Sequence, residues 1–177
     1  MTASLSNLAY EVHKLAEAQG DVCIATAESC TGGNIAHQIT LNAGSSAYFL
    51  GGVVSYANAV KESVLGVPAD ILANPGAVSE PCARAMAEGV RRLLQADLAV
   101  ATTGIAGPGG GTDRKPVGLV YIGLSSNEQT VVEEHHFPGS RPEVIDAATR
   151  RALELLKAAL IDRIPTMAPN AEQTMGT

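Results

Sequence analysis

Short apolar runs alternate with segments of helical periodicity along the chain, and this alternation limits the fold more than any other feature. The runs that predict strands are Val22–Thr26, a stretch within Tyr48–Tyr56, Leu98–Thr103, Val117–Leu124 and Thr130–Phe137. The segments that predict helices begin near Leu5, Cys30, Asn58, Ser79 and Glu143, and Val67–Glu80 is predicted as a loop. Because strands that alternate with helices favour a sheet covered on both faces, we predict an α/β fold. The expected architecture is a single-domain three-layer α/β sandwich with a mixed, largely parallel sheet and one antiparallel hairpin, which the last two strand runs form.

The chain of 177 residues predicts one domain. No linker or internal repeat divides it, so we assign residues 1–163 to the domain and residues 164–177 to a polar tail that we expect to fray. Aromatic residues make up 3% of the chain and tryptophan is absent, so the core must consist mainly of Ala, Val, Leu and Ile. Such small side chains suit helices that pack closely on a sheet.

Charge and cysteine content limit the partners and the compartment. The net charge is −6 and no basic cluster occurs, so we predict no nucleic-acid partner. No apolar run approaches the roughly 20 residues that cross a bilayer, so we predict no membrane partner. The three cysteines have no C-x-x-C spacing, and an odd, sparse set favours reduced thiols and a cytoplasmic location.

The segment Thr26–Gly33, Thr-Ala-Glu-Ser-Cys-Thr-Gly-Gly, carries the first candidate site. It joins a predicted strand to a predicted helix, which places Ser29 on a tight turn. Such a turn offers unpaired backbone N–H groups and the positive end of a helix dipole. Ser29 could cap the helix or act as a nucleophile, and a serine taken alone at this position favours the cap.

A serine nucleophile needs a base, and Lys61 is the best candidate. The four histidines lack a suitable setting, and Ser29 has no G-x-S-x-G context. Lys61 follows Tyr56 by five residues, near the start of a predicted helix, where burial would lower its pKa from about 10.4 toward neutrality. Neutral Lys61 could take the Ser29 proton while Tyr56 relays or holds it. The backbone N–H groups that could form the oxyanion hole are those of Cys30, Thr31, Gly32, Gly33 and Gly104.

These assignments have alternatives. A lysine in the first turns of a helix is usually solvated, and a tyrosine at a strand end usually packs. Cys30 could itself be the nucleophile, because a thiolate is favoured at a helix start. Its simpler interpretation is a small buried side chain.

A glycine-rich loop, Thr103–Gly118, forms the second candidate site. Five glycines lie within residues 104–111, directly after a predicted strand, and such loops let backbone amides approach an anion. The loop matches neither the Walker A motif nor a dinucleotide-binding fingerprint. It could equally be a flexible connection. Arg114, Lys115 and Arg141 are the candidate cations for an anionic ligand.

Taken together, these segments resemble the CinA C-terminal domain family, the nicotinamide mononucleotide deamidases. The matching stretches are Thr26–Gly33, Gly44–Ser46, Gly51–Tyr56 with Lys61, Leu65–Val67, Gly76–Glu80, Thr103–Gly111 and Lys115–Gly118. They follow the family order over roughly residues 5–160, and their combination is far more specific than any one motif. Residues 1–163 are therefore expected to form a CinA C-terminal-like amidohydrolase domain.

The resemblance implies hydrolysis of the carboxamide of nicotinamide mononucleotide to nicotinic acid mononucleotide and ammonia, a step of pyridine nucleotide salvage. It implies catalysis by Ser29, Lys61 and Tyr56 without a metal or a cofactor, and a homo-oligomeric assembly. The residues that we assign to substrate binding are Glu28, Ser45, Ser46, Thr103, Gly107, Gly109, Gly110 and Arg141. The rival hypothesis is a non-catalytic nucleotide-binding regulatory module of the competence/damage-inducible type.

One departure from the family pattern concerns the last helix. The family often has Gly-Asp-Arg followed by a basic residue four places on, whereas this chain has Gly139-Ser140-Arg141 and Ile145. We expect a weaker phosphate or subunit contact there.

Overall fold

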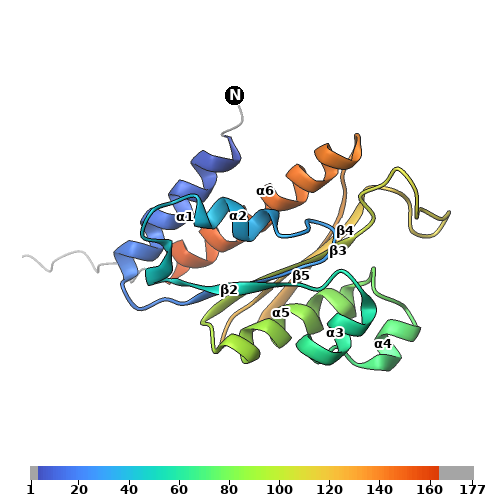
Figure 1. Cartoon of the computed structure of the whole chain (residues 1–177), viewed down its shortest axis with the longest axis horizontal. Coiled ribbons are helices and arrows are strands. Elements are labelled where there is room, and N and C mark those ends of the chain that lie inside the picture. Colours follow the sequence, from blue (N-terminus) through green and yellow to red (C-terminus); the bar gives the residue numbers. More distant parts are fainter. Residues whose placement is uncertain (1–3, 164–177) are drawn as a thin grey trace, which may run out of the picture.

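The computed structural model describes residues 4–163, which form one open five-stranded sheet between two layers of helices (Figure 1). The helices are α1 (Leu5–Gln19), α2 (Asn34–Thr40), α3 (Asn58–Leu65), α4 (Ala69–Ala73), α5 (Glu80–Leu94) and α6 (Arg141–Asp162), with a 3-10 turn η1 at Ser45–Ala47. The strands are β1 (Ile24–Glu28), β2 (Phe49–Val54), β3 (Leu98–Gly104), β4 (Leu119–Ser125) and β5 (Thr130–His136). The predicted α/β class and three-layer arrangement are confirmed. The predicted tail, 164–177, lies outside the described residues.

The sheet has the strand order β2-β1-β3-β4-β5. Strand β1 pairs in parallel with β2 and β3, whereas β4 pairs antiparallel with both β3 and β5. Strand β4 alone is therefore reversed, so the sheet is mixed as predicted, and the expected β4–β5 hairpin is present. Because β1, β2 and β3 point the same way, their carboxyl ends meet at one edge, where open α/β sheets bind their ligands.

Each face of the sheet has its own apolar core. Helices α1, α2 and α6 cover one face, and α3, α4 and α5 cover the other (Figure 1). Small residues let the second layer approach closely: a Cβ on Gly89 of α5 would overlap the Leu65 carbonyl, and one on Gly123 of β4 would lie 2.8 Å from the Ala83 carbonyl oxygen. The prediction of a core with few aromatic residues and closely packed helices is thus confirmed.

Of two predicted helix starts, one is confirmed and the other differs from the observed start in an informative way. Ser79 caps α5 by accepting a hydrogen bond from the Cys82 N–H, as predicted. Helix α2, by contrast, begins at Asn34 and not near Cys30, because Gly33 takes a left-handed conformation at its N-cap. The short helix α4 falls within the segment that was predicted as a loop.

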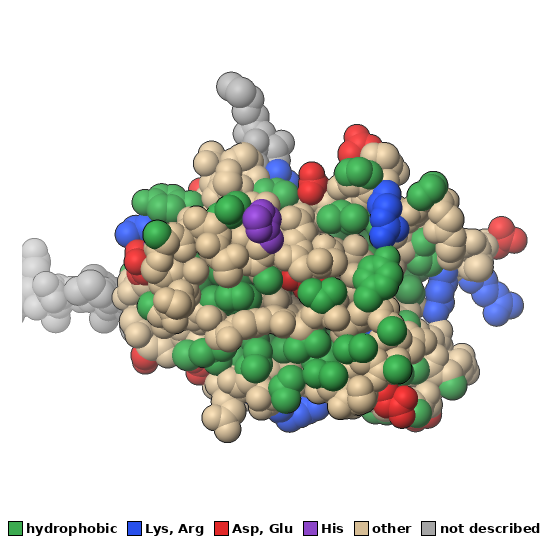
Figure 2. Space-filling model, in the orientation of Figure 1, with side chains coloured by type: hydrophobic (Ala, Val, Ile, Leu, Met, Phe, Trp, Pro, Cys, Tyr) green, Lys and Arg blue, Asp and Glu red, His purple; other side chains and the backbone are tan. Residues whose placement is uncertain are grey.

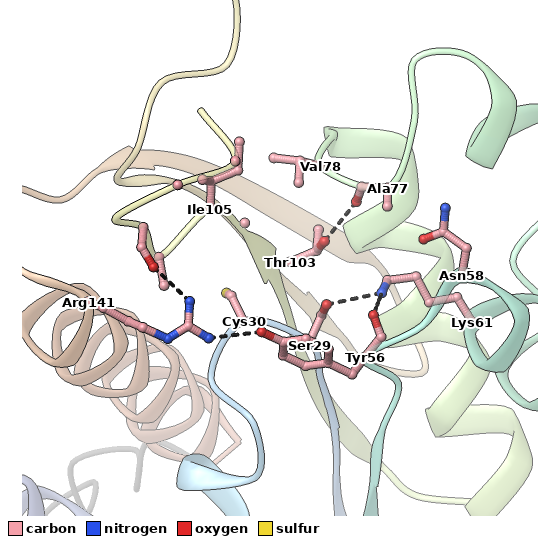
Figure 3. A pocket seen from close by; sticks show the side chains of 15 residues that line it. Ser29, Cys30, Tyr56, Asn58, Lys61, Ala77, Val78, Thr103, Ile105 and Arg141 are labelled. Carbon is pink, nitrogen blue, oxygen red and sulfur yellow. Dashed lines mark hydrogen bonds between the residues drawn. The ribbon is translucent and has the colours of Figure 1, made fainter. Parts of the chain in front are cut away.

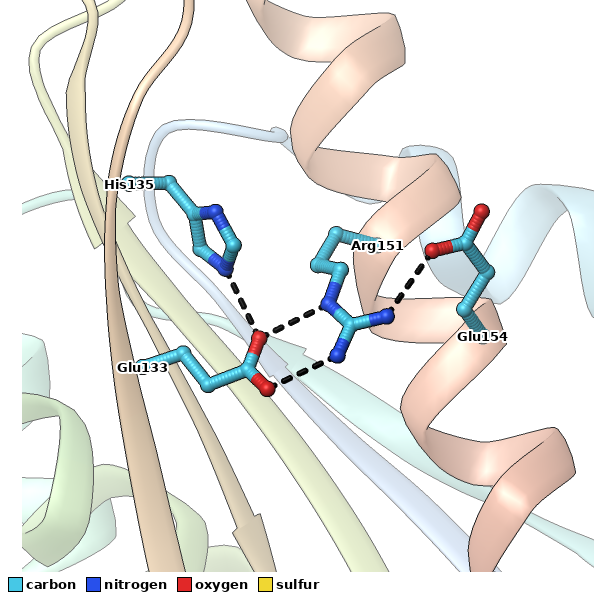
Figure 4. A network of polar contacts seen from close by, with 4 residues as sticks. All are labelled: Glu133, His135, Arg151 and Glu154. Carbon is cyan, nitrogen blue, oxygen red and sulfur yellow. Dashed lines mark hydrogen bonds and ion pairs between the residues drawn. The ribbon is translucent and has the colours of Figure 1, made fainter.

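Strand β5, at one edge of the sheet, is fastened to α6 by charged side chains (Figure 4). Arg151 donates two hydrogen bonds of 2.7 Å to the Glu133 carboxylate and a third to Glu154, and His135 lies 2.7 Å from Glu133. The Arg151 guanidinium holds the pKa of Glu133 at about 2. This network stabilises the contact between the hairpin and the last helix.

Strand β2, at the other edge, has no charged residue. Its Leu50 and Val54 are exposed, as is Leu93 of α5, and Figure 2 shows hydrophobic side chains gathered along this side of the molecule. Edge strands usually carry charges that discourage pairing with other chains. Strand β2 is thus the less protected edge.

None of the helices within residues 4–163 has the length and apolar character needed to cross a bilayer.

Candidate active site

A pocket of about 280 Å³ lies at the carboxyl ends of β1, β2 and β3 (Figure 3). Its lining residues are Ser29, Cys30, Tyr56, Asn58, Lys61, Ala77, Val78, Thr103, Gly104, Ile105, Ala106, Gly107, Gly109, Gly110 and Arg141. They come from the turn after β1, from the start of α3, from the loop before α5, from the glycine-rich loop after β3 and from the start of α6. Segments that are far apart in the sequence therefore meet at the edge where ligands were expected.

The turn after β1 holds Ser29 in place without using its hydroxyl. The Ser29 N–H donates to the Thr102 carbonyl of β3, and the Gly32 N–H donates back to the Ser29 carbonyl. Gly33 and not Ser29 is the N-cap of α2. The interpretation of Ser29 as a helix cap is therefore wrong. Its hydroxyl faces the pocket, and the residue is 9% exposed.

Lys61 reaches Ser29 from α3. Its Nζ lies 3.0 Å from the Ser29 Oγ, 2.6 Å from the Ser55 carbonyl oxygen and 3.4 Å from the Tyr56 carbonyl oxygen. Lys61 is 1% exposed, and this burial lowers its pKa below the usual value because desolvation disfavours the charged amine. The prediction that Lys61 points back to the edge of the sheet is confirmed, and the alternative of a solvated lysine is wrong.

The three contacts of Lys61 suit an uncharged amine. A neutral amine has two protons and one lone pair. In the uncharged form the two carbonyl oxygens accept the two protons and the lone pair faces the Ser29 hydroxyl, whereas in the charged form the amine also donates to the Ser29 Oγ. The uncharged amine is therefore within hydrogen-bond distance to accept the Ser29 proton.

The Tyr56 hydroxyl does not join the pair formed by Ser29 and Lys61. It accepts a hydrogen bond of 2.8 Å from Arg141, whose other terminal nitrogen donates to the Gly107 carbonyl. Tyr56 is 60% exposed, and only its backbone carbonyl contacts Lys61. Among the described residues, the expected relay through the tyrosine hydroxyl is therefore absent from this conformation, although the ring lines the pocket (Figure 3).

The expected oxyanion donors divide into two groups. The N–H groups of Gly32 and Gly33 already donate to the Ser29 carbonyl and to the Glu28 carboxylate, so their assignment to the oxyanion hole is wrong. The N–H groups of Cys30 and Thr31 have no acceptor on any other described residue. Of these, Cys30 lines the pocket, as does Gly104.

Of the residues predicted to bind substrate, those on the glycine-rich loop and α6 line the pocket. These are Thr103, Gly107, Gly109, Gly110 and Arg141. Thr103 donates its hydroxyl proton to the Ala77 carbonyl, and Lys115 donates to the Pro75 carbonyl, so two bonds tie the glycine-rich loop region to the loop before α5.

Three predicted binding residues lie outside the pocket. Ser45 and Ser46 are the first two residues of η1, which precedes the amino end of β2. The pocket lies at the carboxyl end of that strand. Glu28 is buried beneath the turn and binds backbone N–H groups. Within this chain, none of the three is placed to contact a ligand in the pocket.

Sequence reasoning missed five lining residues: Asn58, Ala77, Val78, Ile105 and Ala106. Asn58 is the first residue of α3, two places after Tyr56, so its position after β2 was an available signal. Ala77 and Val78 lie within Gly76–Glu80, one of the stretches that resemble the family, but they reach the pocket only through the fold of the loop before α5.

Cys30 is poorly suited to act as a nucleophile. Burial, with a smaller contribution from the neighbouring Glu28 charge, raises the pKa of its thiol to about 12. Ser140 and Ile145, where the chain departs from the family pattern, have structural roles: Ser140 forms a capping box with Glu143 at the start of α6, and Ile145 packs against the core. Within residues 4–163, no group of three or more His, Cys, Asp or Glu side chains is arranged to hold a metal ion.

Known proteins resemble the chain in both sequence and fold. The family described as CinA C-terminal domain matches residues 5–160. A CinA-like protein from Mycobacterium sp. (strain JLS) is 53% identical over 140 residues, which cover 78% of this chain and 33% of that protein. A putative competence-damage inducible protein from Desulforudis audaxviator is 52% identical over 137 residues, which cover 77% of this chain and 33% of that protein. The chain thus spans about a third of the length of these curated relatives.

Solved structures extend the likeness to the whole fold. A competence/damage inducible protein from Agrobacterium tumefaciens superposes with a TM-score of 0.84 at 40% identity, covering 91% of this chain and 99% of that one. A CinA superfamily protein from Klebsiella pneumoniae gives a TM-score of 0.86 at 36% identity, covering 90% and 99%. Because the family model matches residues 5–160 and the solved structures share the fold at 36–40% identity, the chain belongs to the CinA C-terminal domain family.

Proposed function

We propose that this domain hydrolyses the carboxamide of nicotinamide mononucleotide, with Ser29 as the nucleophile and Lys61 as the base. One observation carries the proposal: a buried lysine amine lies 3.0 Å from a serine hydroxyl and has its two other contacts on carbonyl oxygens. A buried amine with a lowered pKa can activate a serine in this way.

The reaction follows from this pair. Lys61 takes the hydroxyl proton while the Ser29 Oγ bonds to the carboxamide carbon. The negative charge that develops on the amide oxygen is stabilised by the Cys30 N–H and by further donors on the pocket wall. The protonated Lys61 then gives its proton to the leaving nitrogen, and ammonia departs. Water, deprotonated by Lys61, cleaves the acyl-enzyme and restores Ser29.

The substrate assignment rests on the shape and charge of the pocket together with the family resemblance. A cavity of about 280 Å³ lies near the lower end of the range for small-molecule sites, which suits a pyridine carboxamide. The ribose phosphate would extend toward Arg141 and the glycine-rich loop, which line the same pocket. A contact at the phosphate would position the amide for attack.

The test is ammonia release from nicotinamide mononucleotide by the purified chain. We expect release by the wild type and none above background by Ser29→Ala, with unchanged thermal unfolding of that variant. Turnover by Ser29→Ala at the wild-type rate would refute the mechanism. Saturable binding of the nucleotide by the wild type without ammonia release would instead favour a regulatory module, in keeping with the name competence-damage inducible that relatives carry.

Location and assembly stay predictions. A cytoplasmic location and a homo-oligomer are expected from the sequence and the family resemblance, and a single chain tests neither.

A further inference from the structure

Glu28 is a carboxylate buried directly before the nucleophile turn. It is the last residue of β1 and is 1% exposed. An isolated buried carboxylate is costly unless it is paired or hydrogen-bonded. Its hydrogen-bond donors in the described chain are one hydroxyl and three backbone N–H groups, and none of them is a charged side chain. These four hydrogen bonds, all from residues 31–36, offset the free-energy cost of burying the carboxylate.

All four donors lie just beyond Ser29. The Glu28 Oε2 accepts from the Thr31 hydroxyl at 2.7 Å and from the Gly33 and Ile35 N–H groups, each at 3.0 Å. The Oε1 accepts from the Ala36 N–H at 2.9 Å. These bonds fix the chain on the far side of Ser29, while the Ser29 N–H is fixed on the near side by the Thr102 carbonyl. The turn that carries the nucleophile is thus held at both ends.

The Thr31 hydroxyl extends this arrangement to β3. It has one proton, which it donates to Glu28, so in its other contact, at 2.7 Å, it accepts from the Thr102 hydroxyl. Thr102 is buried in β3, next to the strand end that carries the glycine-rich loop. The carboxylate therefore orients a chain of hydroxyl groups that links β1, the turn and β3.

Two backbone hydrogen bonds lie within the turn itself, from the Gly32 N–H to the Ser29 carbonyl and from the Asn34 N–H to the Thr31 carbonyl. Gly32 has a φ of 61° and Gly33 a φ of 99°, and glycine supplies these left-handed conformations without limiting the alternatives. Without the carboxylate, the turn and the start of α2 would lose four hydrogen bonds, and a serine nucleophile with its neighbouring N–H must be held to within a fraction of an ångström.

We propose that Glu28 is a positioning residue, whose carboxylate holds the Ser29 hydroxyl and the Cys30 N–H in the geometry for attack. This inference rests on the proposed function, because it takes Ser29 as the nucleophile. It replaces the predicted role of Glu28 in substrate binding.

The test variant is Glu28→Gln, which keeps the shape of the side chain. A glutamine offers one acceptor oxygen, and its amide group would face an N–H donor, since all four neighbours are donors. We expect kcat for nicotinamide mononucleotide to fall about tenfold or more, with a smaller change in KM, because misplacing reacting groups slows the chemical step. The matched control is Asn34→Ala. It removes the contacts of α2 with Asp146 and Thr149 of α6 but leaves every Glu28 bond in place. This control should lower the melting temperature and keep kcat per folded molecule.

A second readout does not depend on the nucleotide. Phenylmethylsulfonyl fluoride sulfonylates activated serines, and the rate at which Ser29 is labelled, followed by peptide mass spectrometry, should fall with kcat in Glu28→Gln. If that variant does not fold, Thr31→Val serves instead. It removes the hydroxyl that joins Glu28 to Thr102, and we expect slower labelling of Ser29.

The outcomes separate the two proposals. Wild-type labelling and kcat in the folded Glu28 variant, or in Thr31→Val where that variant replaces it, would overturn the positioning role and leave the Ser29 mechanism standing. Labelling that falls in the Glu28 variant, while the wild type releases no ammonia, would support the positioning role and refute the substrate assignment. Ammonia release by Ser29→Ala at the wild-type rate would refute both.

Discussion

The most informative perturbation is Lys61→Met, which removes the amine and keeps a side chain of similar length. General-base catalysis contributes typically 10²–10⁴-fold, so we expect kcat to fall by roughly that factor. The variant also leaves the Ser55 and Tyr56 carbonyl oxygens without the amine donor, at about 1–3 kcal/mol for each group that stays unsatisfied. The substitution also removes the free-energy cost of burying the Lys61 amine, which stabilises the folded variant. Because these two effects oppose each other, the net loss in the free energy of unfolding is smaller than the summed cost of the two unsatisfied groups, whereas kcat falls by the full factor.

The pH dependence of stability gives a sharper signature. Burial lowers the pKa of Lys61 in the folded state, so between this pKa and the unfolded value of about 10.4 the unfolded chain binds more protons at this site. Stability from this group therefore rises as the pH rises through that window. One proton corresponds to a slope of up to about 1.36 kcal/mol per pH unit. Lys61→Met lacks this contribution, so the difference in stability between wild type and variant should grow in favour of the wild type as the pH increases.

The assay is urea unfolding of both proteins, followed by far-ultraviolet circular dichroism at several pH values between neutrality and pH 10. Taking the difference between the two proteins removes most of the contribution of other titrating groups. A difference that does not change with pH would show that the Lys61 amine titrates alike in the folded and unfolded states. That result, or ammonia release by the variant within a few-fold of the wild type, would refute the argument for a neutral buried base.

Three further outcomes are expected. Cys30→Ala should keep kcat within a few-fold, because burial holds this thiol protonated, and loss of turnover together with full folding would point to a thiol nucleophile. Arg141→Met should raise KM for nicotinamide mononucleotide much more than KM for the uncharged nicotinamide riboside in ammonia-release assays, and equal effects would contradict a phosphate contact. Arg151→Met should remove the largest part of the stability that Glu133 contributes, while the His135 contact keeps a smaller part. With a folded pKa of about 2, that contribution is present above the unfolded pKa of about 4.3 and is lost as the pH falls toward 2, so acid unfolding of the variant should lose most of this component.

Most of the fold could be predicted from the sequence because its signals are local. The apolar runs and the helical spacing predicted the five strands and the long helices, and the Ser79 cap fixed the start of α5. The signal failed where local preferences conflict. In α4, Pro68 and Pro75 flank only five helical residues, too few for a periodic pattern to emerge. At α2, the left-handed Gly33 delays the helix by four residues from the expected start near Cys30.

The residues of the candidate site likewise separate into those that local sequence signals predicted and those that they did not. Residues at the carboxyl ends of strands β1 and β3, such as Ser29 directly after β1 and Gly104 at the end of β3, could be assigned to the pocket because parallel strands bring their carboxyl ends together. The assignments that failed depend on where a side chain points or on which end of a strand a loop lies. Ser45 lies at the wrong end of β2, and Glu28 points beneath the turn instead of into the pocket.

The sequence by itself determined the α/β class, the turn that carries Ser29 and the glycine-rich loop, because strand length, helical periodicity and glycine content are properties of short segments. Only the tertiary structure decided that the Lys61 amine meets the Ser29 hydroxyl, that the Tyr56 hydroxyl binds Arg141 and that Glu28 holds the turn. These contacts join residues on different elements, and the packing of α3 and α6 on the sheet sets their distances. The burial that lowers the pKa of Lys61 likewise exists only in the folded chain.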